Sequence, residues 1–240
     1  MADSLAALDR EVTSCTLCPR LVEWRERSAA DPPRRYRGEK YWARPLPGFG
    51  DPGARVLIVG LAPAAHGGNR TGRMFTGDRS GDWLFRALHE AGFANQPEST
   101  HARDGLALSG AYITAALRCA PPANKPLPGE MLRCQPYLLE EIALLADVRV
   151  VVALGKIGWD AYLRARRAAG LPLPRPLPRF GHAARAGMPD GTMLLGSFHP
   201  SQQNTFTGRL TRPMLKRVFS MARRLAATAG PRGSRGRPAR

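Results

Sequence analysis

The sequence predicts an α/β protein in which helices cover both faces of a parallel β-sheet. Four short apolar runs recur along the chain, and longer segments with helical patterns separate them. Strands that alternate with helices in this way form a parallel sheet, because each helix returns the chain to the edge from which the last strand began. At 240 residues, with 43% hydrophobic residues, the chain can bury the core that such a fold requires.

The expected elements follow one another in a regular order. The predicted strands are residues 55–60, 111–117, 148–154 and 192–198. The predicted helices are residues 4–28, interrupted by a turn at two cysteines, then 80–90, 129–146, 156–169 and a last helix opened by Pro213. Pro136 is expected to kink or restart the third of these helices. Residues 29–53 and 170–190 are rich in proline and indicate loops.

The charge of the chain predicts a polyanionic partner. The formal net charge is +17 and the sequence pI is about 11.1, which is most often the signature of a nucleic-acid-binding protein. An arginine-rich proteome or an inert basic tail would give a similar balance. Residues 229–240 form such a tail, expected to be disordered, but without its arginines the net charge is still about +13. No run of eighteen apolar residues is present, which argues against a membrane-spanning helix.

The cysteines predict a metal site. Cys15 and Cys18 form a C-x-x-C pair, which places two thiolates on one side of a turn. Cys119 and Cys134 lie far along the chain, so the fold must bring them to the pair to complete a four-sulfur site.

Other interpretations of these cysteines compete with a metal cluster. Disulfides need an oxidising compartment, and residues 1–12 do not resemble a signal peptide. A redox-active C-x-x-C pair would lie near a βαβ unit and would leave Cys119 and Cys134 unexplained. Zinc sites more often repeat C-x-x-C at short range, so one close pair with two distant cysteines favours a cubane iron–sulfur cluster, with zinc as the alternative.

The loops after the four predicted strands carry the candidate functional residues. Ligands of parallel α/β sheets bind at the carboxyl ends of the strands, so these loops should converge. The loop after the first strand contains five glycines, together with His66, Asn69, Arg70, Arg73, Phe75 and Asp78. The later loops contribute Arg118, Asn124 and Lys125, then Lys156, and finally the segment from His199 to Arg209. Glycines at turns and histidines that merely cap loops would explain each feature singly but not their joint occurrence.

Three segments resemble the family 5 (type B) uracil-DNA glycosylases. They are GLAPAAHGGNRTGRMFTGD after the first strand, the turn Cys119-Ala-Pro-Pro, and HPSQQNTFTGRLT near the end. The resemblance spans residues 12–226 and includes the cysteine spacing. It implies a three-layer αβα sandwich with a central four-stranded parallel sheet, and a 4Fe–4S cluster held by Cys15, Cys18, Cys119 and Cys134. It also implies one glycosylase domain over residues 1–228 that removes deaminated bases from DNA.

The resemblance implies a role for His199 and a departure elsewhere. The family's matching histidine lies beside the base, so His199 is expected to stabilise the leaving base. Related glycosylases place an acid or an amide directly after the first strand, where this chain has Leu61, Ala62 and Ala64. Asp78, which is the only acid in that loop, is therefore the candidate that orients water or stabilises the sugar cation. Capping of the following helix is the alternative role for Asp78.

The base pocket is expected to be weakly polar. Phe75 is a candidate stacking platform, with packing under the loop as its alternative, and Ala62 and Ala115 are expected to line the pocket. The related family 4 enzymes read uracil with an asparagine where this chain has Ala115, so Asn124 is a candidate substitute in the catalytic site. The missing amide predicts excision of hypoxanthine as well as uracil.

The expected partner is double- or single-stranded DNA containing deaminated bases, bound by a monomer in the cytoplasm of a prokaryotic cell, with the nucleoid. The candidate DNA contacts are Arg70, Arg73, Lys125, Lys156, Gln202, Gln203, Asn204 and Arg209. The alternative function is that of an iron–sulfur protein that binds nucleic acid without catalysis.

Overall fold

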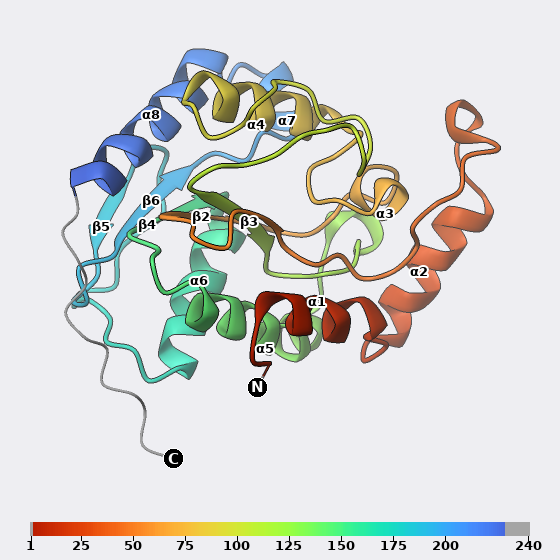
Figure 1. Cartoon of the computed structure of the whole chain (residues 1–240). Coiled ribbons are helices and arrows are strands. Elements are labelled where there is room, and N and C mark those ends of the chain that lie inside the picture. Colours follow the sequence, from red (N-terminus) through yellow and green to blue (C-terminus); the bar gives the residue numbers. More distant parts are fainter. Residues whose placement is uncertain (1, 229–240) are drawn as a thin grey trace.

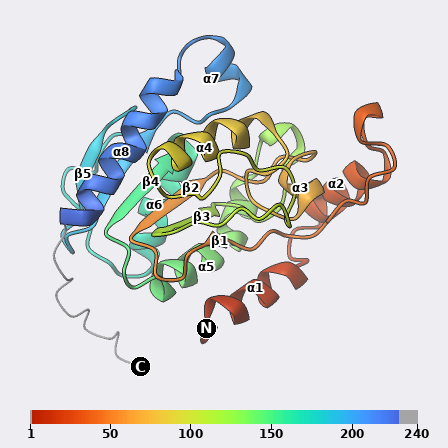
Figure 2. The same cartoon turned by 45° about the horizontal axis from the view of Figure 1, so that its top comes forward.

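A six-stranded, mostly parallel sheet lies at the centre of the computed structural model, which describes residues 2–228 (Figures 1 and 2). The expected basic tail, residues 229–240, lies outside the described residues. Along the sheet the strand order is β1-β3-β2-β4-β6-β5. Their bounds are β1 Phe49–Gly50, β2 Val56–Gly60, β3 Ala111–Ala115, β4 Val150–Leu154, β5 Arg185–Gly187 and β6 Met193–Ser197.

The four central strands β3, β2, β4 and β6 run parallel, and β1 and β5 add antiparallel edges. The sequence predicts only the four central strands, so the expected four-stranded sheet lacks the two edge strands of the observed six-stranded sheet. The edge strands have two and three residues and none of these is fully buried, so they leave no apolar run in the sequence. Each central strand, in contrast, is buried over nearly its whole length, as parallel strands covered on both faces are.

Helices form a layer on each face of the sheet. The long helices are α1 Leu5–Ser14, α2 Pro19–Ala30, α4 Arg79–Glu90, α5 Pro128–Leu144, α6 Lys156–Ala168 and α8 Arg212–Thr228. The short ones are η1 Arg34–Tyr36, α3 Gly68–Thr71, η2 Pro122–Asn124 and α7 Gln202–Phe206. Figure 1 shows α4 and α8 above the sheet, with α5, α6 and α1 below it.

The alternation of side chains along the strands produces two cores. On one face Ile58 and Val152 pack in the same apolar cluster as Phe85 of α4 and Phe219 of α8. On the other face Leu57 and Val151 pack with side chains of α5 and α6, among them Trp159. Neighbouring residues of one strand therefore serve opposite layers, which makes the sandwich three-layered.

Helix α5 is continuous through Pro136, where the sequence predicts a kink or restart. A proline leaves the carbonyl four residues earlier without its helical donor. Here Leu132 and Pro136 are both exposed, so water can satisfy that carbonyl. Within residues 2–228 no helix has both the length and the apolar character that crossing a bilayer would require.

Helix α6 approaches strand β2 closely at Gly158. A Cβ at this position would lie 2.5 Å from the carbonyl oxygen of Val59, which is backbone and cannot move aside alone. Substitution of Gly158 must therefore displace the helix from the sheet.

We expect Gly158→Ala to lower the free energy of unfolding by about 1–3 kcal/mol through this overpacking. Gly129→Ala is the matched control, because Gly129 lies in the first turn of α5 and the nearest atom to its Cβ would be Arg133 Nη1 at 3.5 Å. The control should be neutral or slightly stabilising. Denaturant unfolding of both variants measures the difference, and equal midpoints would contradict the close packing.

Candidate active site at the carboxyl edge of the sheet

The loop between β2 and α4 has a compact shape that depends on glycine and on strained backbone. Phe75 has a φ of 53°, in the left-handed region that non-glycine residues seldom adopt. A Cβ on Gly81 would lie 1.8 Å from the carbonyl oxygen of Phe75, and a Cβ on Gly67 would lie 2.2 Å from Asp78 Oδ2. Residues 61–78, the glycine loop, therefore need glycine on both sides of the predicted functional residues.

Asp78 is the N-cap of α4. Its Oδ1 accepts a hydrogen bond from the backbone N–H of Gly81 (3.0 Å), so the alternative role expected for this residue is present in the structure. Its Oδ2 lies beside Gly67 in the glycine loop. Burial raises the pKa of Asp78 above its ordinary value, although the hydrogen bonds from Gly81 and Ser80 oppose this shift. One carboxylate can thus cap the helix with one oxygen and present the other to the loop.

His199 lies two residues after the end of strand β6, beside Phe75. The centroids of the two rings are 5.8 Å apart and the ring planes are inclined at 31°, so residues from two distant loops meet as the sequence predicts. Burial lowers the pKa of His199 to about 4, which leaves the imidazole neutral at physiological pH. The carbonyl of His199 accepts a hydrogen bond from Asn204 Nδ2 (2.9 Å), which fixes the backbone at this point.

The two alanines predicted to line the base pocket lie near this pair. Ala115 is buried at the end of β3, paired in the sheet with Gly60, and Ala62 is half-buried just after β2. Asn124, in contrast, is exposed in the η2 turn with a φ of 55°. Its exposure argues against the predicted role in reading the base, and its left-handed backbone, which asparagine tolerates well, gives it a local purpose.

Arg73 does not have the environment of a DNA contact. Its side chain is 5% exposed, and Nη2 bonds both carboxylate oxygens of Asp104 (2.9 and 2.7 Å). Its Nε donates to Thr76 Oγ1 (2.9 Å). The structure therefore corrects the prediction that Arg73 binds phosphate. Its role is a buried ion pair that holds the glycine loop to residues 99–104.

Arg70 is also used within the protein. It pairs with Glu39 (2.5 Å), and its Nε and Nη2 donate to the carbonyls of His66 (2.9 Å) and Gly77 (3.0 Å). These contacts argue against Arg70 as a free phosphate ligand. Because they join the two ends of the glycine loop, they give Arg70 a structural role instead.

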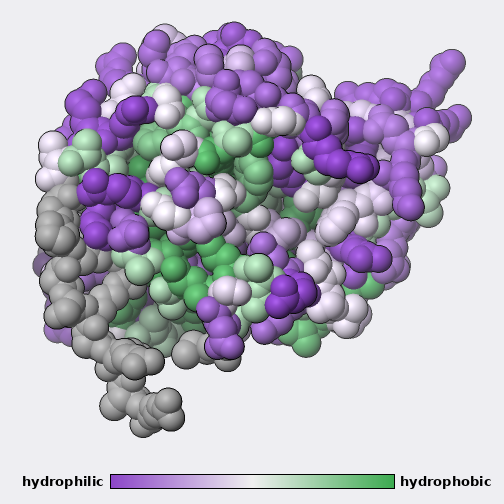
Figure 3. All heavy atoms as spheres, viewed as in Figure 1, coloured by the Kyte–Doolittle hydropathy of each residue, from purple (hydrophilic) through white to green (hydrophobic). Residues whose placement is uncertain are grey.

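The other predicted DNA contacts are exposed, apart from one. Lys125, Lys156, Gln202, Gln203 and Arg209 are exposed. Asn204 is half-buried and supports His199, so it is not free to insert into DNA. Hydrophilic residues cover much of the face formed by α4, α8 and the segment after α2 (Figure 3).

An aromatic cluster beside the glycine loop was not predicted from the sequence. Tyr41 Oη and His66 Nδ1 are hydrogen-bonded (3.0 Å), and the ring of Tyr36 stacks on His66 at 6.3 Å. The guanidinium of Arg70 lies 4.2 Å from the centre of the Tyr36 ring. The alternation of tyrosine and arginine in RRYRGEKY, within a segment expected to be loop, is the signal that could have indicated it.

The four cysteines line one cavity together with Arg25, Arg118 and Tyr137. Each sulfur accepts a hydrogen bond. Arg25 Nη1 donates to Cys119 (3.3 Å) and Arg133 Nε donates to Cys18 (3.4 Å). The backbone N–H of Arg118 donates to Cys134 (3.3 Å), and Tyr137 donates to Cys15. Burial raises the pKa of Cys119 to about 11 and that of Cys134 to about 12. Within residues 2–228, no group of three or more His, Cys, Asp or Glu side chains is arranged to hold a single metal ion.

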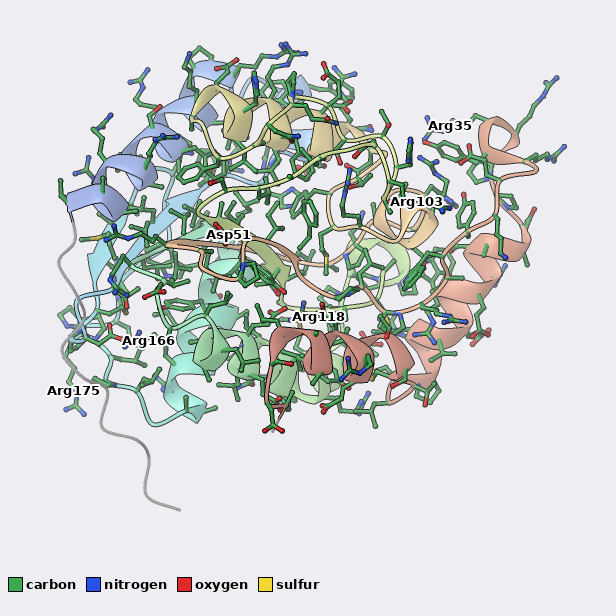
Figure 4. All side chains as sticks on the ribbon, viewed as in Figure 1. Arg35, Asp51, Arg103, Arg118, Arg166 and Arg175 are labelled. Atoms are coloured by element: carbon green, nitrogen blue, oxygen red, sulfur yellow. The ribbon has the colours of Figure 1, made fainter. Side chains whose placement is uncertain are left out.

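A buried charge network lies beside this cavity. Arg118, which is 1% exposed, forms an ion pair with Glu141 of α5, and Glu141 also accepts a hydrogen bond from Thr114 of β3 (2.5 Å). Figure 4 shows Arg118 between α1 and the sheet. The network fixes the backbone that leads into Cys119 to both the sheet and the helix that carries Cys134.

Fold and site together define an α/β protein with a neutral histidine, an aromatic ring and a half-buried carboxylate in the loops at the carboxyl edge of its sheet, and with four thiols around one cavity. Residues 47–223 match the family model of the uracil DNA glycosylase superfamily, and the chain belongs to this superfamily.

Within it the chain is similar to type-5 uracil-DNA glycosylases. That of Mycobacterium tuberculosis is 51% identical over 226 residues, covering 94% of this chain and 83% of the relative. That of Thermus thermophilus is 53% identical over 224 residues, covering 91% and 99%. A type-4 uracil-DNA glycosylase of Pyrobaculum aerophilum is 35% identical over 135 residues, 55% of this chain.

The opposite pKa shifts of Asp78 and His199 predict a pH profile with a single acid limb. If an ionised Asp78 is needed, the single-turnover rate of base release should fall as pH drops through its raised pKa. No inflection near pH 6.5 is expected, because the pKa of His199 is about 4. Asp78→Asn should abolish the acid limb and slow release by roughly 10²–10⁴-fold. An inflection near neutrality that disappears in His199→Ala would show that the histidine titrates instead.

Arg73 and Arg209 should separate stability from DNA binding. Arg73→Met leaves Asp104 buried without its partner and should lower the free energy of unfolding by about 3–5 kcal/mol. Its remaining folded fraction should bind DNA normally. Arg209→Met, at an exposed position, should change stability by less than about 0.5 kcal/mol. It should reduce the slope of log affinity for DNA against log salt concentration by about one, because one phosphate contact is lost. Unfolding and binding at several salt concentrations test both, and a reduced salt dependence in folded Arg73→Met would contradict the assignment.

Proposed function

We propose that the protein excises uracil and other deaminated bases from DNA by hydrolysing the N-glycosidic bond, leaving an abasic site. The observation that carries this proposal is the meeting of His199 with Phe75 and the glycine loop at the carboxyl edge of the sheet. A base inside a duplex is shielded by stacking, so it must be flipped out at a cost of about a few kcal/mol. The basic charge of the chain and its exposed Lys125, Lys156 and Arg209 suit the phosphates on both sides of the flipped nucleotide.

The two titratable groups have environments that fit this reaction. Bond cleavage leaves negative charge on the departing base, and a neutral imidazole at His199 can donate a hydrogen bond there without first acquiring a proton. Donors of this kind are worth about 3 kcal/mol of transition-state stabilisation. Asp78, as a carboxylate, can orient the attacking water or stabilise the positive sugar. Phe75 is 8% exposed and packs in the core beside Ala115, so only a small part of its ring would face the base.

The four cysteines fit a 4Fe–4S cluster. Four sulfurs lie around one cavity, and one close C-x-x-C pair with two distant cysteines is a spacing that favours a cubane cluster over zinc. Hydrogen bonds to the sulfurs from Arg25, Arg133 and the backbone of Arg118 would stabilise the negative charge of the ligands. When bound, the cluster would supply a structural link between the N-terminal helices and the segments after β3.

The pocket residues support a broad range of substrates. Rejecting a wrong base usually depends on a buried polar group that the wrong base leaves unpaired. The end of β3 offers buried Ala115, and Asn124 is too exposed to replace the missing amide. We therefore include hypoxanthine among the substrates, and expect discrimination against normal bases to come from the ease of flipping.

The proposal covers the assembly as well. We propose that residues 1–228 act as one domain, as a monomer, on double- and single-stranded DNA in the prokaryotic nucleoid. The competing function, an iron–sulfur protein that binds nucleic acid without catalysis, would use the charge and the cysteines alone. It would give no reason for His199 and Phe75 to meet.

A panel of oligonucleotide duplexes tests the proposed function. Uracil and hypoxanthine should both be released, and uracil in a mismatch should be released faster than uracil paired with adenine, because a mispaired base extrudes at lower cost. Strand cleavage by alkali after incubation reports each abasic site. Release of uracil alone, at one rate whatever base it faces, would contradict the broad pocket. Binding of every duplex without any release would favour the non-catalytic function.

A further inference from the structure

Asn69 connects the glycine loop to the four-cysteine cavity. Its side chain is 1% exposed although it is an amide, and Nδ2 donates to the carbonyls of Arg25 in α2 (3.1 Å) and Ala65 (3.3 Å). The guanidinium of the same Arg25 donates from Nη1 to Cys119 Sγ and to the carbonyl of Cys15, both at 3.3 Å. One residue of α2 therefore contacts two of the four cysteines with its side chain and the glycine loop with its backbone.

Residues 42–46 make a second connection between the same two regions. The N–H of Ala43 donates to the carbonyl of Asn69 (3.0 Å), and the N–H of Leu46 donates to the carbonyl of Arg118 (2.8 Å), the residue before Cys119. Pro45 lines the cysteine cavity. The side chain of Leu46 lies against Gly68, where a Cβ would come within 2.9 Å of it. Asn69 is thus held from two sides by segments that also contact the cysteine cavity.

The position of Asn69 bears directly on Asp78. Gly67, two residues before Asn69, lies against Asp78 Oδ2. The residue after it is Arg70, which holds the carbonyls of His66 and Gly77. A shift of Asn69 would therefore move the backbone on which the carboxylate rests, and a misplacement of about 1 Å in a catalytic group can lower a rate about a hundredfold.

We propose that Asn69 is a positioning residue for base excision and that, through Arg25, it couples the geometry of the glycine loop to the four-cysteine centre. The effect on base release rests on the proposed function. The effect on the order of the glycine loop rests on the hydrogen bonds alone. Neither residue touches the base. Their effect is on where Phe75 and Asp78 lie.

Asn69→Leu provides the first test, because leucine has a similar size and lacks both donors. Hydrogen exchange of residues 61–78 should accelerate, and single-turnover release of uracil should slow by about tenfold to a hundredfold. The affinity for uracil-containing duplex should change much less, and the visible spectrum and iron content should equal those of the wild type. Asn95→Leu is the control, since Asn95 Nδ2 also braces a loop, by donating to the carbonyl of Gly105 (2.9 Å), but at an exposed position that does not line the four-cysteine cavity.

Arg25→Met provides the second test and leaves the sequence of the glycine loop unchanged. Loss of the hydrogen bond to Cys119 should alter the visible spectrum, and exchange should accelerate in residues 61–78 as well as around residues 15–30. Arg25→Lys, which keeps a donor and the charge, should restore the spectrum and the exchange at least in part. The comparison of Arg25→Met with Arg25→Lys also keeps the proposal testable if Asn69→Leu does not fold.

The outcomes are separable. Wild-type exchange and wild-type release rates in folded Asn69→Leu would overturn the proposal, as would an Arg25→Met effect confined to residues 15–30. Equal losses in Asn69→Leu and Asn95→Leu would also overturn it, because the effect would then be a general one. If the wild type releases no base at all, the proposed function fails. Exchange in residues 61–78 still decides whether the loop and the cysteine centre are coupled.

Discussion

The meeting of Cys15 and Cys18 with Cys119 and Cys134 is the constraint on which the rest of the site depends. It closes a loop of about a hundred residues, and such a closure must be stabilised by strong contacts to offset the lost chain entropy. Helix α2 lies at the side of the sheet and not on one of its faces (Figure 1). It contacts α5 through Arg20 with Glu130, and the segment after β3 through Arg25 with Cys119. Together with buried Leu21, these contacts hold α2 in place, and with it the support beneath the glycine loop.

Desolvation acts on the two titratable residues in opposite directions and gives them different roles. The loops of a parallel α/β sheet gather at its carboxyl edge, and here Leu61, Ala62 and Ala64, the first residues after β2 apart from Pro63, are apolar. Burial lowers the pKa of His199 and raises that of Asp78, so a neutral donor and a weak base lie in two loops at the same edge of the sheet. The acid or amide that related glycosylases place soon after the first strand is absent from this chain. In the proposed function Asp78 supplies the carboxylate from the far end of the glycine loop, where it also caps α4. A long, glycine-rich loop is what allows that substitution.

Much of this arrangement could be predicted from the sequence, and the exceptions have physical reasons. The four central strands are continuous apolar runs, and the order of loops after them follows from their parallel direction. The meeting of His199 with Phe75 followed from the same rule. Strands β1 and β5 could not be predicted because they are short and bury too little apolar surface to leave an apolar run in the sequence. Arg73 was expected on DNA because an arginine beside glycines indicates phosphate binding, whereas its buried partner, Asp104, lies far along the chain. The exposure of Asn124, which argues against its predicted role, could not be foreseen because the residue type alone does not reveal that a side chain faces solvent. Tyr36, Tyr41 and His66 come together only through tertiary contacts.

The most direct test of this account is the metal content of full-length protein purified without oxygen. A four-cysteine junction that holds a 4Fe–4S cluster should give close to four irons and four acid-labile sulfides per chain, with broad visible absorption and a brown colour. Each of the variants Cys15→Ala, Cys18→Ala, Cys119→Ala and Cys134→Ala should lose most of that iron. Stoichiometric zinc without iron, or a colourless protein that keeps its fold and its glycine loop ordered, would contradict the central place given to the cysteine junction.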